Sequence, residues 1–295
     1  MKYKKVNDEL ILKIDSKYHH HPISDIFHDL HLSKKTIHLL RQYKQYRLNG
    51  QYVDIQTAVS ANDELAIKAY EHGIDFIPQP FDLDIIYEDE ILCIVSKPAH
   101  TIIYPETKEG KDTLCNYVAW HYLQTHQDYP VRALHRLDRD TTGLVMFCKC
   151  QLLQPCFDEL ISSKKLSKHY LAWIEGHLDH SPLTISKPIG NDRHHKQKMI
   201  ISKTGKNAMT HVKQLKQKQG YSLVECQIET GRKHQIRLHL STISHPILAD
   251  ELYGKKSRYI SRLALHAWRL QFSHPLTNKK MDIICDIPED MKKLL

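Results

Sequence analysis

The chain has 295 residues, of which 41% are hydrophobic and 26% charged, and its formal net charge is +8 at pH 7. This composition is typical of a folded protein of about two domains, and it excludes a disordered tail or a miniprotein. The sequence has no apolar run of about 18 residues, no apolar core after its basic N-terminus and no Cys-x-x-Cys pair among its seven cysteines, which predicts a soluble cytoplasmic protein without a membrane span.

Two short amphipathic helices and a hairpin are predicted near the N-terminus. Apolar residues recur at helical spacing between residues 26 and 43, and Ser33 is a suitable N-cap for the second helix. The pair Asn49-Gly50 lies between strand-forming residues, which predicts a hairpin over residues 46–53. Two helices and a hairpin would form one compact module.

A weakly periodic stretch at residues 71–83 contains one Gly and two Pro and is typical of a linker. We therefore predict a small domain over residues 1–75 and a second domain over residues 76–295. Strand-forming residues dominate the second domain, and the predicted elements follow in chain order: two strands around an acidic turn in 85–98, a strand at 144–147, a helix at 151–165, a strand at 170–176, a hairpin at 208–229, and closing strands at 262–272 and 280–285. This order predicts an α+β fold with a mixed, largely antiparallel sheet flanked by helices.

Residues 135–143 place Asp138 among cationic side chains, directly before the apolar run at 144–147. This arrangement favours an ionised carboxylate held on a rigid strand, because a nearby cation stabilises the charged form of an acid. Such a carboxylate can attack a carbon atom or orient a cation. On charge alone, a solvated turn or a structural ion pair is an equally open interpretation.

The segment 135–143 resembles the His-Arg-Leu-Asp-x-x-Thr-Ser-Gly motif of the RluA family of pseudouridine synthases, with Thr142 in place of Ser. In that family the Asp, here Asp138, is the catalytic residue. The segment Lys168-His169-Tyr170 resembles the family's Lys-x-Tyr motif, whose Tyr stacks on the target base and is the favoured candidate for removing the proton from C5.

Residues 229–239 resemble the family's Gly-Arg-x-His-Gln-Ile-Arg-x-His motif at the start of a predicted helix. The resemblance implies that Arg237 pairs with the catalytic Asp, which suits the planar guanidinium fork of Arg. It also implies that Arg136 enters the space vacated in the RNA when the base is flipped out. The substrate-binding residues expected around the site are Arg136, Arg232, His234 and Gln235.

The implied reaction breaks the C1′–N1 bond of uridine, rotates the uracil and joins C1′ to C5, and it needs no metal or cofactor. The carboxylate could attack C1′ or remove the H2′ proton, and the sequence leaves both routes open. Two motifs are weaker: Ser96-Lys97-Pro98 lacks the family's Asn and Gly, and Ala249 replaces a customary Gly in the segment 245–254.

RNA is the expected partner. The N-terminal module loosely resembles the alpha-L RNA-binding module, and a net charge of +8 suits a polyanionic ligand. Family members act on ribosomal or transfer RNA, and we expect ribosomal RNA here, with a monomeric protein as the default. The cations expected to contact RNA in this module are Lys34, Lys35, Arg41, Lys44 and Arg47.

Three alternatives remain open. A metal enzyme could use residues 19–21, 194–195 and the Cys148-x-Cys150 pair, but their spacing matches no common zinc site. A glycosidase would need two carboxylates, and no second acid is indicated near these motifs. A non-catalytic RNA-binding protein with the same fold would not need to retain Asp138, Tyr170 and Arg237 together.

Overall fold

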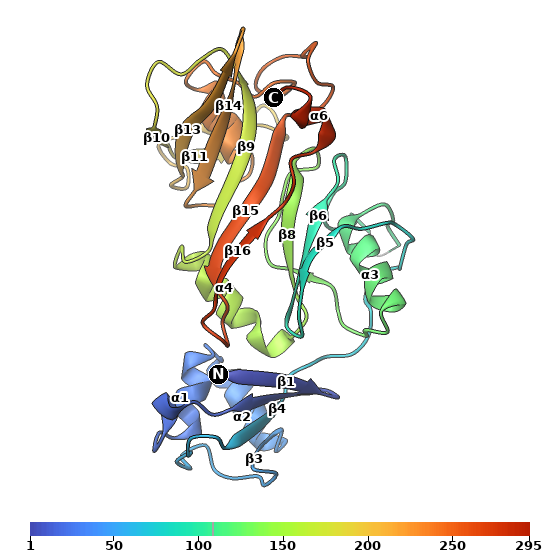
Figure 1. The fold of residues 1–295 in the computed structure, drawn as a ribbon, viewed down its shortest axis with the longest axis vertical. Coiled ribbons are helices and arrows are strands. Elements are labelled where there is room, and N and C mark those ends of the chain that lie inside the picture. The colour runs from blue at the N-terminus through green and yellow to red at the C-terminus, as the bar shows by residue number, and fades with distance from the viewer. Residues whose placement is uncertain (108) are drawn as a thin grey trace.

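The computed structural model describes residues 1–107 and 109–295. Figure 1 shows a small N-terminal unit below a larger one, and each unit is built around its own sheet. Residues 71–83, where the linker was predicted, contain no helix or strand. None of the helices in the described part of the chain is long and apolar enough to cross a membrane.

The N-terminal unit packs two helices on a four-stranded antiparallel sheet of order β1-β2-β4-β3. Ser33 caps the second helix as predicted, because the Thr36 backbone N–H donates to Ser33 Oγ at 3.0 Å. The elements are β1 (Lys2–Val6), β2 (Glu9–Lys13), α1 (Ile23–Asp29), α2 (Lys34–Gln42), β3 (Tyr46–Leu48) and β4 (Glu64–Lys68).

The prediction of a hairpin over residues 46–53 is right for the turn and wrong for the strand that was expected to follow it. Asn49 and Gly50 adopt positive φ angles of 48° and 83°, as a tight turn requires. The chain then leaves the sheet, and β3 pairs with β4 instead. The Asn49 side chain favours this pairing, since its Oδ1 accepts from the Glu64 backbone N–H at 2.9 Å.

The larger unit contains a ten-stranded sheet whose main path runs β10-β13-β14-β9-β15-β8-β6-β5. Among the described residues, the pair β15 and β8 is parallel and the other pairs are antiparallel, which confirms the mixed, largely antiparallel sheet. The strands are β5 (Ile85–Glu88), β6 (Leu92–Lys97), β7 (Arg132–Ala133), β8 (Thr142–Cys148), β9 (Ser167–Glu175), β10 (Leu183–Ser186), β13 (Met209–Lys218), β14 (Tyr221–Ile228), β15 (Leu265–Ser273) and β16 (Lys280–Ile284), with β11 (Ile189–Asn191) and β12 (Met199–Ile201) forming a separate hairpin. The helices are α3 (Leu114–Gln124), α4 (Gln154–Ser162), α5 (Gln235–Ser241) and α6 (Glu289–Lys292).

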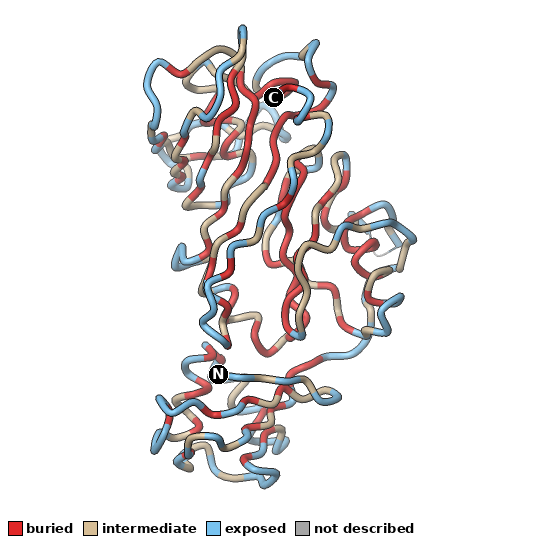
Figure 2. Tube along the Cα trace, in the orientation of Figure 1, coloured by how far each residue is buried: buried red, intermediate tan, exposed pale blue. Residues whose placement is uncertain are grey.

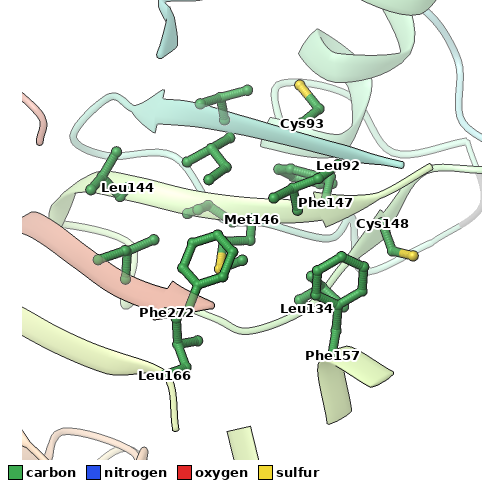
Figure 3. Packing of buried hydrophobic residues seen from close by; sticks show 14 of the residues in the cluster. Leu92, Cys93, Leu134, Leu144, Met146, Phe147, Cys148, Phe157, Leu166 and Phe272 are labelled. Carbon is green, nitrogen blue, oxygen red and sulfur yellow. The ribbon is translucent and has the colours of Figure 1, made fainter. Parts of the chain in front are cut away.

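Strand β8 is buried along its whole length, and Figure 2 shows the buried residues concentrated on the central strands. In Figure 3, Phe157 of α4 and Phe272 of β15 lie with Leu166 on one side of β8. On the other face, Phe147 pairs in register with Cys93 of β6. This two-sided packing makes β8 a rigid base for the loop that precedes it.

The two units contact each other at the end of the β15–β16 hairpin. The Met1 amino group donates to the Leu276 carbonyl at 2.6 Å, and Tyr3 stacks on His274 with ring centroids 5.5 Å apart. The Cys156 thiol of α4 donates to the Leu30 carbonyl at 3.1 Å. These contacts hold the N-terminal unit against the lower end of the large sheet (Figure 1).

Gly143 lies where β8 and β15 approach most closely. Its φ is 109°, and a Cβ atom there would lie 2.2 Å from the Ala267 carbonyl oxygen. We expect Gly143→Ala to lower the free energy of unfolding by about 3 kcal/mol or more, from overpacking and backbone strain together. Chemical denaturation measures this loss. The control is Gly220→Ala, which has a φ of 83° but no atom within 4 Å of the new Cβ, and should cost about 1 kcal/mol.

Glu88 should make folding sensitive to acid. Burial alone would raise its pKa, but hydrogen bonds from His121, Lys149 and Gln127 outweigh burial and lower the pKa to about 2. Because the folded chain then binds this proton more weakly than the unfolded chain, the stabilisation is complete above the ordinary value of 4.5 and is lost as pH falls from 4.5 towards 2. We expect Glu88→Gln to reduce the slope of stability against pH in this window, while Glu90→Gln, at an exposed position, should leave it unchanged.

Candidate active site

Asp138 lies in the loop between β7 and β8, not on a strand. The strand begins at Thr142, because residues 138–141 form a turn in which the Thr141 N–H donates to the Asp138 carbonyl at 3.2 Å. The prediction of a carboxylate on a rigid strand is therefore wrong by a few residues. The Asp138 side chain is 26% exposed, which leaves it accessible to a ligand.

Lys97 anchors this loop from the opposite side. Its ammonium group donates to the carbonyl oxygens of Pro98, Thr101 and Arg139 at 2.8, 2.8 and 2.9 Å. The residue is only 1% exposed, and burial lowers the pKa of Lys97 to about 7 against the opposing charges of Asp140 and Asp138. The incomplete motif at residues 96–98 thus keeps a side chain that holds the loop.

Arg237 joins two carboxylates. Its Nε and Nη2 donate to the two oxygens of Asp250 at 2.8 Å each, and its Nη1 donates to Asp138 Oδ2 at 3.2 Å. Burial alone would lower the pKa of Arg237, but the hydrogen bonds and charges of both acids raise it, so that the guanidinium stays charged. The structure therefore brings Arg237 to Asp138, and it adds Asp250, whose role the sequence analysis missed.

Asp250 does not provide the second acid of a glycosidase. Its side chain is 0% exposed, and besides the Arg237 fork it accepts the backbone N–H groups of Leu252 and Tyr253 at 3.0 and 3.1 Å. A carboxylate so completely bonded and shielded from solvent positions its neighbour and does not contact a ligand.

His234 presents a neutral imidazole to Asp138. It has a left-handed φ of 55°, and its Nε2 lies 3.8 Å from Asp138 Oδ2. Tyr253 Oη accepts the Met199 N–H at 2.7 Å and lies 3.0 Å from His234 Nδ1, which fixes the orientation of the ring. Burial lowers the pKa of this imidazole, so it is neutral at neutral pH.

Tyr170 lies on β9 and is 6% exposed. Burial, together with the charge of Asp138, raises the pKa of Tyr170, so that its phenol remains protonated at neutral pH. A protonated phenol suits a stacking surface for a base better than it suits proton removal in the unliganded enzyme.

The remaining residues predicted at the site fall into different environments. Arg136 is exposed and makes no side-chain hydrogen bond or ion pair within the described residues, so its guanidinium is available to a ligand. Arg232 is exposed and donates to the Asn207 carbonyl at 3.1 Å. Gln235 has an internal role: its amide oxygen accepts from Thr230 and Arg232, and its amide nitrogen donates to Met209 and Thr210. It has little capacity left for a substrate.

The five cations predicted to contact RNA in the N-terminal unit are exposed on α2 and the segment that follows it. Arg41 pairs with Asp54 at 3.5 Å, and Arg47 pairs with Glu9. No ion pair is found among the described residues for the other three, Lys34, Lys35 and Lys44.

One described group of side chains has the spacing of a metal site: Glu88, Cys93 and His121 have ligand atoms within 4.8 Å of one another. The donors do not fit a cation, because Lys149 Nζ already lies 2.9 Å from the Glu88 carboxylate. Burial also raises the pKa of Cys93, which keeps its thiol protonated.

Comparisons with known proteins agree with this geometry. The family described as RNA pseudouridylate synthase matches residues 91–242, and the RluD ribosomal pseudouridine synthase N-terminal domain matches residues 10–65. The chain belongs to the RluA/RluD family of RNA pseudouridine synthases. It is therefore an isomerase, and the resemblance seen in its motifs is confirmed.

This pseudouridine synthase is similar to relatives along most of its length. It is 37% identical over 268 residues to the uncharacterized RNA pseudouridine synthase YhcT of Bacillus subtilis, covering 90% of this chain and 89% of the relative. It is 31% identical over 290 residues to ribosomal large subunit pseudouridine synthase D of Escherichia coli K12, covering 92% and 88%. The solved structure of human RNA pseudouridylate synthase domain containing 4 shares the fold, with a TM-score of 0.60 and 24% identity over 71% of this chain and 90% of that one.

Breaking the Arg237 fork should disable the site without unfolding it. We expect Asp250→Asn to lower the rate of pseudouridine formation by roughly 100-fold, because Arg237 then shifts relative to Asp138. Tritium released from RNA labelled at uridine C5 measures the rate. Asp282→Asn is the matched control, since it breaks a similar fork to Arg269, with two contacts of 2.7 Å, at a surface position. Equal losses in both variants would contradict the positioning role of Asp250.

Proposed function

We propose that this pseudouridine synthase isomerises uridines in ribosomal RNA, with Asp138 as its catalytic carboxylate. The observation that carries the proposal is the convergence of Arg237 and His234 on one accessible acid, Asp138, whose charge also acts on Tyr170. Arg237 donates a hydrogen bond to Asp138 and the neutral His234 lies beside it, while the charge of Asp138 acts on the Tyr170 ring.

The reaction begins with a uridine outside the stack, because a stacked base cannot reach a loop carboxylate. Arg136, exposed two residues before Asp138, is available to fill the vacated space in the RNA. Tyr170 then stacks on the uracil, and Asp138 either bonds to C1′ or removes the H2′ proton while the C1′–N1 bond breaks. Arg237 compensates the changing charge on Asp138 in both routes.

Rotation of the uracil and formation of the C1′–C5 bond leave one proton to be removed from C5. Tyr170 carries its own proton at neutral pH, so it must first give that proton up if it is to act as the base. Asp138 is the other candidate base: it is free again once its bond to C1′ has broken or, in the other route, once it has returned the H2′ proton to C2′. No protein group needs to change its oxidation state in any of these steps.

Ribosomal RNA is supported as the substrate by the relatives and by the N-terminal unit. The E. coli relative is named as a synthase of the large ribosomal subunit, and the matching N-terminal family is described as ribosomal. The three cations without ion pairs among the described residues, Lys34, Lys35 and Lys44, give this unit a surface for RNA phosphates.

The cysteines bear on the compartment in which the enzyme works. All seven are free and buried, which suits a reducing cytoplasm.

Replacing the carboxylate should abolish turnover. We expect Asp138→Asn to lower tritium release from RNA labelled at uridine C5 by roughly 1,000-fold or more, because the amide neither bonds to C1′ nor accepts H2′. The control is Asp140→Asn, which removes an acid paired with His100 at 2.9 Å from the same loop. Tritium release that persists in Asp138→Asn would remove the catalytic assignment.

The substrate class needs a separate test. We expect cells without this gene to lose specific pseudouridines from large-subunit ribosomal RNA, and a plasmid copy of the wild type, but not of Asp138→Asn, to restore them. Pseudouridine mapping across ribosomal and transfer RNA measures this. Loss confined to transfer RNA would overturn the ribosomal assignment and leave the enzyme class intact.

A further inference from the structure

Lys168 lies on the same face of β9 as Tyr170, because the two residues are two positions apart on one strand. Lys168 is in register with Ile228 of β14, which is in register with Thr210 of β13. Thr210 Oγ1 bonds to His239 of α5 at 2.9 Å, so this face of the sheet is the one covered by the helix that carries Arg237. Lys168 therefore faces the active-site side.

The Lys168 side chain is mostly buried, and its ammonium group has no partner among the described residues. The residue is 7% exposed, yet within residues 1–107 and 109–295 no carboxylate lies within 4.0 Å of its Nζ and no acceptor takes a hydrogen bond from it. The other two buried lysines are satisfied: Lys97 donates to three carbonyl oxygens, and Lys149 donates to Glu88 and to the Asp89 carbonyl. A largely desolvated cation favours an anionic partner, and the Nζ atom keeps some exposure through which a ligand can reach it.

The surroundings of Lys168 belong to the two loops of the active site. A Cβ atom on Gly231 would lie 3.4 Å from Lys168 Nζ, which places the ammonium beside the loop that carries Arg232 and His234. His135, in the loop of Asp138, is the second neighbour. Burial and the charge of Lys168 lower the pKa of His135 to about 3, so this ring stays neutral and does not compete for an anion. Its Nδ1 is buried and also has no hydrogen-bond partner.

We propose that Lys168 binds a backbone phosphate of the substrate RNA, next to the uridine that stacks on Tyr170. The inference rests on the proposed function, since it takes RNA as the ligand. Phosphates are the anionic groups of RNA, and an ammonium is a compact point charge that binds phosphate well. Two residues along a strand span about 7 Å, which suits a base at Tyr170 and its flanking phosphate at Lys168.

The test compares the wild type with Lys168→Met, Lys168→Arg and Lys213→Met. Lys213 is exposed and lies on the opposite face of the sheet, since it is in register with Glu225 and Leu171. Three quantities are measured for each: the melting temperature without RNA, the Kd for a protein-free ribosomal RNA transcript at several KCl concentrations, and the single-turnover rate with that transcript at saturating enzyme.

For Lys168→Met we expect a melting temperature equal to or above that of the wild type, because the variant replaces a mostly buried lysine, whose charge no described residue compensates, by an apolar side chain of similar length. Its Kd at low salt should rise about 10-fold, and the slope of log Kd against log[KCl] should fall by about 0.7–0.9, the value for one phosphate contact. The saturated rate should stay within about threefold. Lys168→Arg should keep most of the affinity, and Lys213→Met should behave as the wild type.

Two outcomes would overturn the inference. A melting temperature several degrees lower with unchanged Kd would make Lys168 structural, and a large fall in the saturated rate with an unchanged salt slope would place its role at the uracil. The binding measurement needs no turnover, so a wild type that binds the transcript but never releases tritium would refute the proposed function while leaving the phosphate contact testable.

Discussion

The active site depends on one guanidinium shared by two carboxylates. Asp250 is 0% exposed, and a buried acid of this kind is stable only if its charge is compensated, which the Arg237 fork does through two contacts of 2.8 Å. The fork uses Nε and Nη2, so Nη1 is left to reach Asp138, 99 residues earlier in the chain, at 3.2 Å. Asp250 thus fixes the position of Asp138 through Arg237, without touching Asp138 itself. Lys97 holds the same loop from the other side.

The charges of the site follow from that arrangement. The two acids and Arg237 sum to a single negative charge, and neither His234 nor Tyr170 adds a charge at neutral pH, since burial lowers the pKa of His234 and raises that of Tyr170. One net anion beside a neutral imidazole and a neutral phenol suits chemistry in which charge must appear and disappear on Asp138. Lys168 is the exception, a cation without a counterion among the described residues, and the proposed RNA phosphate would compensate its charge.

The sequence predicted the chemistry of the site better than its geometry. The motifs around Asp138, Tyr170 and Arg237 led to the family because their residue types and order are specific, and strands such as β9 and the β13–β14 hairpin show in local patterns. Strands β1 and β2 escaped notice because short, charge-rich alternation also occurs in surface loops. The Asn49-Gly50 turn was predicted, but the pairing of β3 with β4 was not. This pairing depends on tertiary contacts, such as the hydrogen bond between Asn49 and Glu64, 15 residues later in the chain. The motifs contain Asp250, Lys97 and Lys168, but the sequence does not show what their side chains contact. The three-dimensional structure gives hydrogen-bond partners to Asp250 and Lys97 and none among the described residues to Lys168.

The placement of the N-terminal unit limits which RNAs can use both parts of the protein. Asp138 lies near the end of the sheet where His266 of β15 is in register with Thr142, whereas the N-terminal unit packs on His274, after the other end of β15. Eight residues of strand separate these points by about 25 Å. An RNA that contacts α2 and also delivers a uridine to Asp138 must extend along β15 over a span of this order. A folded RNA keeps two such points at a constant separation, whereas a short flexible strand would lose conformational entropy to do so, and this favours structured RNA as the substrate.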